Sequence, residues 1–478
     1  MTGERRYAET VPPLDQMGIV HLVGVGGAGM SVVARLLAAR GVPVQGSDAQ
    51  GGPALEALER DGVRVWVGHD AAHVAGASTL VVSSAVRESN PELVAARATG
   101  LTVLHRSQAL AALMEGARAV AVAGAHGKTT TSAMIAVLLD HAGLEPSFAI
   151  GGTVRTADGA LPGGRLGAGD VLVAEADESD GSFLNYRPWV AVVTNVEPDH
   201  LDHYGSTQAF EGAFAAFASR VRPGGALVVC VDDPGARRLA ERHRATGGVV
   251  VTYGTDADAQ VRVEDYRALD EGSASVVVVQ EVAGVSARLP MHLLVPGAHN
   301  ALDAAAAVAV AILAGVEPAV AVAGVGRFVG TGRRFEPRGE AGGVRVVDDY
   351  AHHPTEVAAL LRATRPVAGE GRVLVLFQPH LFSRTRAFAS EFAAALDLAD
   401  DVVVTGVYAS REDLDPSVTG ELITSRMAGP VRYVEDRTQA AVAIARAARP
   451  GDVVLTVGAG DVTELGETIL RVLGGADA

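Results

Sequence analysis

The segment 120–131 carries the residues with the clearest chemical role, in the order Val-Ala-Val-Ala-Gly-Ala-His-Gly-Lys-Thr-Thr-Thr. An apolar run that stops at a glycine and continues as Gly-Lys-Thr into a helical pattern is typical of a phosphate-binding loop. The free N–H groups at the helix start would bind phosphate oxygens, Lys128 would reach the β- and γ-phosphates, and Thr129 would ligate Mg²⁺. The match is imperfect, because Val122 stands where the usual pattern has its first glycine. A tight turn with a solvated lysine is the alternative. The predicted ATP or GTP site comprises Gly124, Ala125, His126, Gly127, Lys128, Thr129 and Thr130.

A second glycine-rich turn, 24–30, follows an apolar run near the start of the chain. Its Gly24-x-Gly26-x-x-Gly29 spacing, with Asp48 further on, is the pattern that holds a dinucleotide pyrophosphate on a helix N-terminus. The pattern determines anion binding but not the ligand. We predict a pyrophosphate here and regard a redox nicotinamide as the less favoured ligand.

Acids and histidines follow two further apolar runs. The run 170–175 leads into Glu-Ala-Asp-Glu-Ser-Asp, and the run 190–194 leads into Asn-Val-Glu-Pro-Asp-His. Side chains that leave the carboxyl ends of parallel strands converge on the ligand crevice, and carboxylates there suit Mg²⁺. Thr129, Glu175 and His200 are therefore the predicted metal ligands, and a polar loop with helix-capping acids is the alternative.

Another polar cluster belongs to the last third of the chain. The run 344–350 ends in Asp-Asp-Tyr and continues as Ala-His-His-Pro-Thr-Glu, and the run 372–377 leads to Arg384 and Arg386. Earlier, Asn300 and Asp303 lie three residues apart at the start of an alanine-rich helix, as a buried cap or as groups that recognise a base. The later turn 458–461 has no lysine and is predicted to be a plain strand–helix turn.

Strands and helices alternate through the chain, which indicates an α/β fold with doubly wound parallel sheets. The predicted division is a tail (1–15), a Rossmann-like domain (16–116), a central P-loop ATPase-like α/β domain (117–326) and a C-terminal Rossmann-like α/β domain (327–478). Alternating polar and apolar residues at 247–295 predict a small antiparallel section, and the Gly- and Arg-rich segment 325–340 a linker.

The composition excludes several classes of protein. Over 478 residues the net charge is −16, which disfavours a nucleic-acid partner. One cysteine, Cys230, excludes an internal disulfide and a cysteine zinc cluster, and its apolar surroundings predict a buried thiol. The polar N-terminus and the short apolar runs predict a soluble, cytoplasmic protein without a signal peptide or membrane span.

Six motifs in this order resemble those of the Mur ligases, over nearly the whole chain. The motifs are Gly26–Met30, Gly127–Thr131, Glu175–Asp180, Asn195–His200, Gly297–Asn300 and Asp348–Glu356. The resemblance implies a cytoplasmic ATP-dependent ligase of peptidoglycan precursor synthesis that joins L-alanine to the carboxylate of UDP-N-acetylmuramate through an acyl phosphate. It further implies two Mg²⁺ ions, which Mn²⁺ can replace, and a monomer or weak homodimer.

The resemblance also assigns roles to individual residues. The implied catalytic residues are Lys128, Glu175, His200, His352 and Arg384. His299 and Asn300 would lie at the adenine, and Tyr350, His352 and Arg384 would hold the amino acid. The implied UDP-sugar residues are Gly26, Gly27, Ala28, Gly29, Met30, Ser47, Asp48 and Ser84. The chain departs from the family at Asp303, where relatives often have asparagine, and around Pro379-His380, which leaves Arg384 or Arg386 for the alanine carboxylate.

Three other functions stay open at this stage. A recycling ligase would add a preformed tripeptide to the same nucleotide sugar. A nucleotide-switched binding protein would turn over ATP slowly and without an amine acceptor. An NAD-linked oxidoreductase fused to an ATPase would need a hydride-transfer site, for which the sequence offers no obvious candidate.

Overall fold

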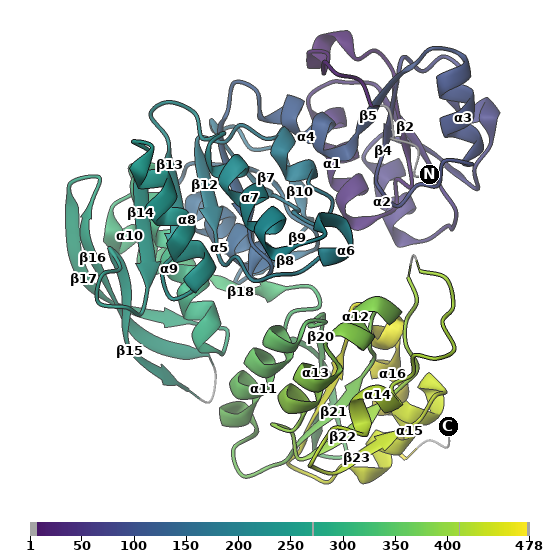
Figure 1. The fold of residues 1–478 in the computed structure, drawn as a ribbon, viewed down its shortest axis with the longest axis vertical. Coiled ribbons are helices and arrows are strands. Elements are labelled where there is room, and N and C mark those ends of the chain that lie inside the picture. The colour runs from purple at the N-terminus through teal and green to yellow at the C-terminus, as the bar shows by residue number, and fades with distance from the viewer. Residues whose placement is uncertain (1–6, 270–271, 411, 476–478) are drawn as a thin grey trace. The chain divides into compact units, whose positions relative to one another are not determined.

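The computed structural model describes residues 7–269, 272–410 and 412–475, without the side chains of residues 201 and 202 (Figure 1). These residues divide into two units. The first unit contains the chain up to Glu264 together with Val276–Met291 and Leu302–Phe328. The second unit contains Asp265–Ser275, His292–Ala301 and the chain from Val329 onward. The large sheets are mainly parallel, with helices between the strands, so the predicted α/β class is confirmed.

The first sheet has the order β3-β2-β1-β4-β5, and all its strand pairs are parallel. Its central strand is buried at every position, as expected for a sheet covered on both faces. The strands are β1 (Val20–Val23), β2 (Val44–Asp48), β3 (Arg64–Val67), β4 (Thr79–Val82) and β5 (Thr102–His105). The helices are α1 (Ala28–Ala39), α2 (Pro53–Arg60), α3 (Pro91–Ala98) and α4 (Arg106–Met114).

The second sheet has the order β10-β7-β11-β6-β12-β13-β14-β15-β16-β17. Its strands are β6 (Arg118–Ala123), β7 (Ser147–Ala149), β10 (Gly164–Arg165), β11 (Val171–Glu175), β12 (Val190–Val193), β13 (Ala226–Cys230), β14 (Val250–Gly254), β15 (Val261–Ala268), β16 (Ser273–Val282) and β17 (Val285–Leu293). An antiparallel hairpin, β8 (Val154–Thr156) with β9 (Gly159–Leu161), lies outside it. The helices are α5 (Lys128–His141), α6 (Leu201–Tyr204), α7 (Thr207–Ala218), α8 (Pro234–Ala245), α9 (Ala298–Leu313) and α10 (Pro318–Val325).

The segment predicted as antiparallel is so only in part. β14 pairs in parallel with β13, because helix α8 returns the chain to the same edge of the sheet, and it also pairs in parallel with the start of β15. The two-residue turn at Ala283 and Gly284, both with positive φ, joins β16 and β17 as a tight hairpin. Cys230 is buried in β13 as predicted, and burial raises its thiol pKa to about 12.

The third sheet has the order β19-β20-β24-β21-β22-β23. Its strands are β19 (Glu336–Ala341), β20 (Val344–Asp349), β21 (Val373–Phe377), β22 (Asp401–Val404), β23 (Val431–Tyr433) and β24 (Val453–Val457). Its helices are α11 (Pro354–Ala368), α12 (Phe382–Ala387), α13 (Ala389–Leu396), α14 (Glu421–Thr424), α15 (Arg437–Ala447) and α16 (Leu465–Leu473). Figure 1 shows α11 and α13 on one face of this sheet and α15 and α16 on the other, each face with its own apolar core.

The predicted linker at 325–340 contains the point at which the chain passes from the first unit to the second, after Phe328, but it is not a loop. It contains β18 (Phe328–Thr331) and most of the antiparallel edge strand β19. The many glycines and arginines in this segment suggest a loop, but the pairing of β19 with β20 outweighs that local preference. None of the helices in the described part of the chain is long and apolar enough to cross a membrane.

One apolar core joins the first two sheets. It contains residues of the first sheet and its helices, such as Met30 and Leu36, and aromatic residues of the second, such as Phe183 and Phe217. The close approach is visible where α1 meets β10, because a Cβ on Gly164 would lie 3.1 Å from Cα of Val32. The two sheets of the first unit are therefore packed against each other.

Candidate active site

The predicted nucleotide loop lies between the carboxyl end of β6 and the first turn of α5. Gly127 has φ +81° and precedes the helix, a conformation that side chains rarely adopt. Gly124 has φ +137°, and a Cβ there would lie 2.0 Å from Oγ1 of Thr194. Both glycines are required by the backbone, and the N–H groups at the start of α5 are left for an anion.

The next strand holds this loop in place. The backbone N–H of His126 donates to Oδ1 of Asn195 at 3.1 Å, and Nδ2 of Asn195 donates to the carbonyl of His126 at 3.1 Å. The hydroxyl of Thr194 donates to the same carbonyl. Thr194 and Asn195 have no role predicted from the sequence, although both directly follow β12 at the edge where ligands bind.

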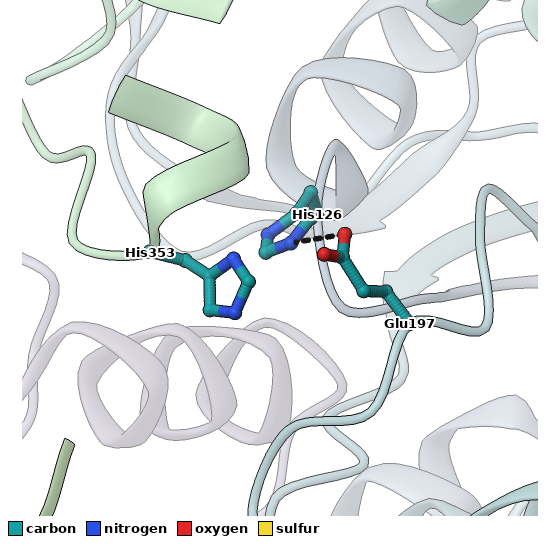
Figure 2. A group of neighbouring side chains, drawn as sticks. All are labelled: His126, Glu197 and His353. Atoms are coloured by element: carbon teal, nitrogen blue, oxygen red, sulfur yellow. Dashed lines mark ion pairs between the residues drawn. The ribbon is translucent and has the colours of Figure 1, made fainter. Parts of the chain in front are cut away.

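The side chain of His126 belongs to the same arrangement. Its Nε2 lies 3.2 Å from a carboxylate oxygen of Glu197, as Figure 2 shows. His126 is thus fixed both through its backbone and through its ring.

Lys128 is the only lysine in the sequence. Its ammonium group donates to the carbonyl of Gly124 at 2.6 Å and to Oε1 of Glu178 at 2.9 Å. Burial would lower the pKa of Lys128, but Glu178 and the neighbouring acids raise it above its usual value, so the charge is kept. The Lys128 ammonium group therefore already lies at the loop where a phosphate would bind.

Thr129 and Glu175, predicted as ligands of one metal ion, lie together. The Thr129 hydroxyl donates to Oε2 of Glu175 at 3.0 Å, and the backbone N–H of Gly151 donates to Oε1 at 2.6 Å. A hydroxyl and a carboxylate at the end of a phosphate loop are the oxygen donors that Mg²⁺ prefers. These residues fit a magnesium ion.

His200 lies beside two other acids. Its Nε2 is 3.5 Å from Oδ2 of Asp199 and 4.0 Å from Oε1 of Glu178. The other oxygen of Glu178, Oε2, is buried and has no hydrogen-bond donor in the described part of the chain. Burial raises the pKa of Glu178, although Lys128 opposes this shift. A buried carboxylate oxygen without a donor, next to a histidine, fits a second divalent cation.

The glycine-rich turn before α1 opens onto a cavity of about 710 Å³, a size typical of ligand pockets. The predicted residues that line it are Gly27, Ala28, Gly29, Met30 and Asp48. Gly26 supports the turn, since its N–H donates to Oδ2 of Asp48 at 2.9 Å. Ser47 is fully buried and Ser84 donates to Asp180, and neither is among the lining residues.

Arg106 is a candidate that the sequence analysis does not single out. It lines the same cavity, and a Cβ on Gly29 would lie 2.0 Å from its Nη1, so its guanidinium group lies against the glycine turn. Its Nη2 is 3.3 Å from Oδ2 of Asp177. Burial would raise the pKa of Asp177, but Lys128 and Arg106 lower it to about 2. Its place directly after β5 is the signal that could have identified it.

The second unit contains the residues predicted for the amino acid. The rings of Tyr350 and His352 have centroids 5.1 Å apart, and the guanidinium of Arg333 lies 4.9 Å from the Tyr350 centroid. Burial lowers the pKa of His352 to about 3, with Arg384 acting in the same direction, although Glu356 opposes it. A neutral imidazole therefore lies near the Arg384 charge.

The structure separates the two arginines between which the sequence could not choose. Arg384 is only 6% exposed, whereas Arg386 is exposed and its Nη2 lies 2.6 Å from Oδ2 of Asp415. A buried guanidinium group is the better candidate for a small carboxylate.

The residues predicted for the adenine are less clearly arranged. His299 is exposed, and the amide of Asn300 donates to the carbonyl of Pro296 at 2.6 Å. Asp303, one turn further along α9, accepts from the Thr131 hydroxyl at 2.9 Å. A Cβ on Gly127 would lie 2.9 Å from the same Asp303 oxygen, so Asp303 lies against the nucleotide loop.

Three family models match most of the chain. The Mur ligase family catalytic domain matches residues 19–118, the Mur ligase middle domain 122–311, and the Mur ligase glutamate ligase domain 333–460.

Curated relatives and solved structures agree with these matches. The UDP-N-acetylmuramate–L-alanine ligase of Kineococcus radiotolerans is 57% identical over 99% of both chains, and that of Thermobifida fusca is 53% identical over 96% of this chain and 98% of its own. The crystal structure of UDP-N-acetylmuramate-alanine ligase from Thermotoga maritima has a TM-score of 0.78 at 29% identity, covering 95% of this chain and 99% of that one. A murein peptide ligase from Psychrobacter arcticus shares the fold, with a TM-score of 0.71 at 24% identity, over 96% and 100%.

Proposed function

Because this chain belongs to the Mur ligase family, we propose that it is an ATP-dependent ligase that joins L-alanine to the carboxylate of UDP-N-acetylmuramate. One observation carries this proposal: two anion-binding sites lie in the same unit and are connected to each other. The nucleotide loop with Lys128 and the pyrophosphate pocket with Arg106 are connected through Asp177. A carboxylate on a nucleotide sugar and the γ-phosphate of ATP can thus be brought together. The full-length identity to curated alanine ligases supports the choice of substrates.

The reaction has two steps. An oxygen of the muramoyl carboxylate attacks the γ-phosphorus of ATP, ADP leaves, and an acyl phosphate forms. The amine of L-alanine then attacks the acyl carbon, phosphate leaves, and the amine loses a proton as the amide forms. Since two anions must approach in the first step, neutralising their charge is the main catalytic problem. Lys128 and the N–H groups at the start of α5 would bind the phosphates, and Arg106 the pyrophosphate of the sugar.

Mg²⁺ would be held by Thr129 and Glu175, and a second ion by His200 with Glu178 beside it. Bound Mg²⁺ or Mn²⁺ supplies further positive charge to the phosphates. Glu175 is oriented by the Gly151 N–H and His200 lies beside Asp199, so these ligands are already positioned by the protein.

The third domain would bind the amino acid. Arg384 is the proposed partner of the alanine carboxylate, and Tyr350 and His352 would line the same site. His352 is neutral at physiological pH and can accept a hydrogen bond from the alanine amine. The division at about residues 116 and 326 would give each domain one substrate, and the enzyme would act as a monomer or weak homodimer.

The test is phosphate release from ATP with Mg²⁺ and UDP-N-acetylmuramate, with and without L-alanine, followed by mass spectrometry of the nucleotide sugar. We expect turnover only with all three substrates and a product heavier by one alanine residue. Turnover with a tripeptide in place of alanine would instead identify a recycling ligase. Phosphate release that ignores the nucleotide sugar would overturn the proposal.

A further inference from the structure

A buried carboxylate behind the pyrophosphate pocket is surrounded by hydrogen-bond donors. Glu92, in the first turn of α3, is 0% exposed. Ser47 Oγ donates to its Oε2 at 2.6 Å, and Nδ1 of His69 lies 3.1 Å from the same oxygen. Nδ1 of His73 lies 2.9 Å from Oε1, and Nε2 of His21 lies 3.6 Å from it. None of these residues has a role in the proposed mechanism.

The carboxylate is ionised at neutral pH. Burial alone would raise the pKa of Glu92, but His21 and the hydrogen bonds of Ser47 and His73 lower it to about 2. The position at the start of α3 also favours a negative charge, because the helix dipole is positive there. An ionised carboxylate can only accept hydrogen bonds, so each group that contacts it must donate.

This requirement determines where His69 carries its proton. Nδ1 of His69 lies 2.9 Å from Ser47 Oγ and 3.1 Å from Glu92 Oε2. Ser47 uses its only hydrogen toward Glu92, so Nδ1 faces two acceptors and must itself carry hydrogen. In the neutral ring, Nε2 on the opposite edge then has a free lone pair and is an acceptor.

The remaining histidines agree with this assignment. The Gln45 amide donates to the His73 carbonyl at 2.8 Å, and its nitrogen lies 3.3 Å from Nδ1 of His21. Nδ1 of His21 therefore accepts, and its Nε2–H is directed at Glu92. The His73 ring stacks on Trp66 with centroids 4.7 Å apart. Glu92 thus joins β1, β2 and the segment after β3 to the start of α3.

His69 is the member of this cluster that reaches the cavity. It lines the pyrophosphate pocket together with Asp48, Asn90 and Pro91, and 24% of its side chain is exposed. We propose that Glu92 is a positioning residue of this pocket, which acts through Ser47 and His69 to present the His69 Nε2 as a hydrogen-bond acceptor to the uridine part of the nucleotide sugar. The chemistry fits, because the uracil imide N–H and the ribose hydroxyls are donors.

This inference rests on the proposed function, since it takes the nucleotide sugar as the ligand of the pocket. The test compares Glu92→Gln, His69→Ala and the double variant with wild type. Glu59→Gln is the control, because it makes the same change of charge at an exposed carboxylate on helix α2.

We expect Glu92→Gln to raise the KM for UDP-N-acetylmuramate about tenfold, which corresponds to the loss of one hydrogen bond between His69 and the ligand. The kcat and the KM for ATP should change less than about twofold, because Glu92 does not contact the nucleotide loop. His69→Ala should act similarly, and the double variant should be no worse than His69→Ala, because Glu92 acts through that ring. Glu59→Gln should match wild type.

Two results would overturn the positioning role alone: an unchanged KM in a folded Glu92→Gln protein, or effects of the two substitutions that multiply in the double variant. A wild-type enzyme that does not turn over the nucleotide sugar would overturn the proposed function instead. The tautomer is tested without any substitution in the cluster, by ¹⁵N–¹H NMR of the histidine rings, with His69→Ala used only to assign the signal. We expect an Nδ1–H signal for His69, and an Nε2–H tautomer would contradict the inference even if Glu92→Gln failed to fold.

Discussion

Two glutamates of the first unit, one in helix α3 and one in the loop after β11, are almost equally buried but differ in the direction in which their pKa is shifted. Glu92 is 0% exposed and Glu178 is 1% exposed. The pKa of Glu92 is lowered to about 2, whereas burial raises that of Glu178 above its ordinary value. Burial alone therefore does not decide the charge of a carboxylate; the donors around it do.

The surroundings explain the difference. Both oxygens of Glu92 have donors, from a serine and from histidine rings. Glu178 has Lys128 on one oxygen, no donor on the other within the described residues, and Asp177 beside it. A satisfied buried carboxylate stabilises the fold, and an incompletely satisfied one is stabilised by a further cation.

The largest effect is expected from removing the partner of Glu178. Lys128→Ala should lower kcat by roughly 10²–10³-fold, since it removes a cation that would act on the transferred phosphoryl group. Phosphate release measures this loss. Because Lys128 is the only lysine in the sequence, an amine-reactive reagent should modify only this side chain and the N-terminal amine, and ATP should protect it in mass spectrometry. A variant that keeps more than half of the wild-type turnover would contradict the role of Lys128.

Glu178→Gln should lower kcat by about 10–10²-fold and affect the free energy of unfolding less, because the amide oxygen can still accept the hydrogen bond of Lys128. The amide removes the acceptor for a second cation, while Lys128 keeps its bonds to the carbonyls of Gly124 and Ala125. Steady-state kinetics over a range of Mg²⁺ concentrations, beside urea denaturation, separates these two effects. The idea fails if the variant loses stability but not turnover.

Glu92→Gln should show the opposite balance. We expect the free energy of unfolding to fall by about 2–3 kcal/mol, because one end of the amide places a donor against the donors of the cluster. The kcat should stay near that of wild type. Urea denaturation measures the loss, with Glu59→Gln as the matched control, and an unchanged midpoint would show that the cluster does not stabilise the sheet.

The smallest expected effect is the pH dependence of the stability lost in Glu92→Gln. The folded pKa of Glu92 is about 2 and its ordinary value is 4.5, so its stabilising effect is complete above pH 4.5 and is lost as the pH falls toward 2. The shift corresponds to roughly 3 kcal/mol at about 1.4 kcal/mol per pKa unit. The difference in stability between wild type and Glu92→Gln should therefore narrow between pH 5 and 3. Melting temperatures in that range measure it, and a constant difference would mean that the charge of Glu92 is not the cause.

The sequence predicts those parts of the site that are local in the chain. The nucleotide loop is one continuous segment, so the spacing of Gly127, Lys128 and Thr129 already specifies a strand, a turn and a helix start. Glu175 could be named because it ends a strand that runs parallel to β6. The α/β class is predicted for the same reason, since each strand–helix step is visible in its own residues.

What the sequence does not predict is assembled from distant segments. The donors around Glu92 come from residues 21, 47, 69 and 73, and no local pattern connects them. The family resemblance implies that Ser47 lies at the ligand beside Asp48. Neighbouring residues of a strand point to opposite faces, however, and Ser47 points to the buried one. The glycines and arginines of 325–340 predict a linker, but the edge strand β19 in this segment forms through its pairing with β20, which its composition does not reveal.

The core shared by the first two sheets has a consequence for how the protein unfolds. The sheet with the glycine turn and the sheet with the nucleotide loop bury apolar residues against each other, including Met30, Leu36, Phe183 and Phe217. Cutting the chain between them would expose that surface to water on both pieces, at a cost that rises with the apolar area. We therefore expect these two sheets to unfold as one cooperative unit, in a single transition on heating, even though the family models divide them at about residue 120.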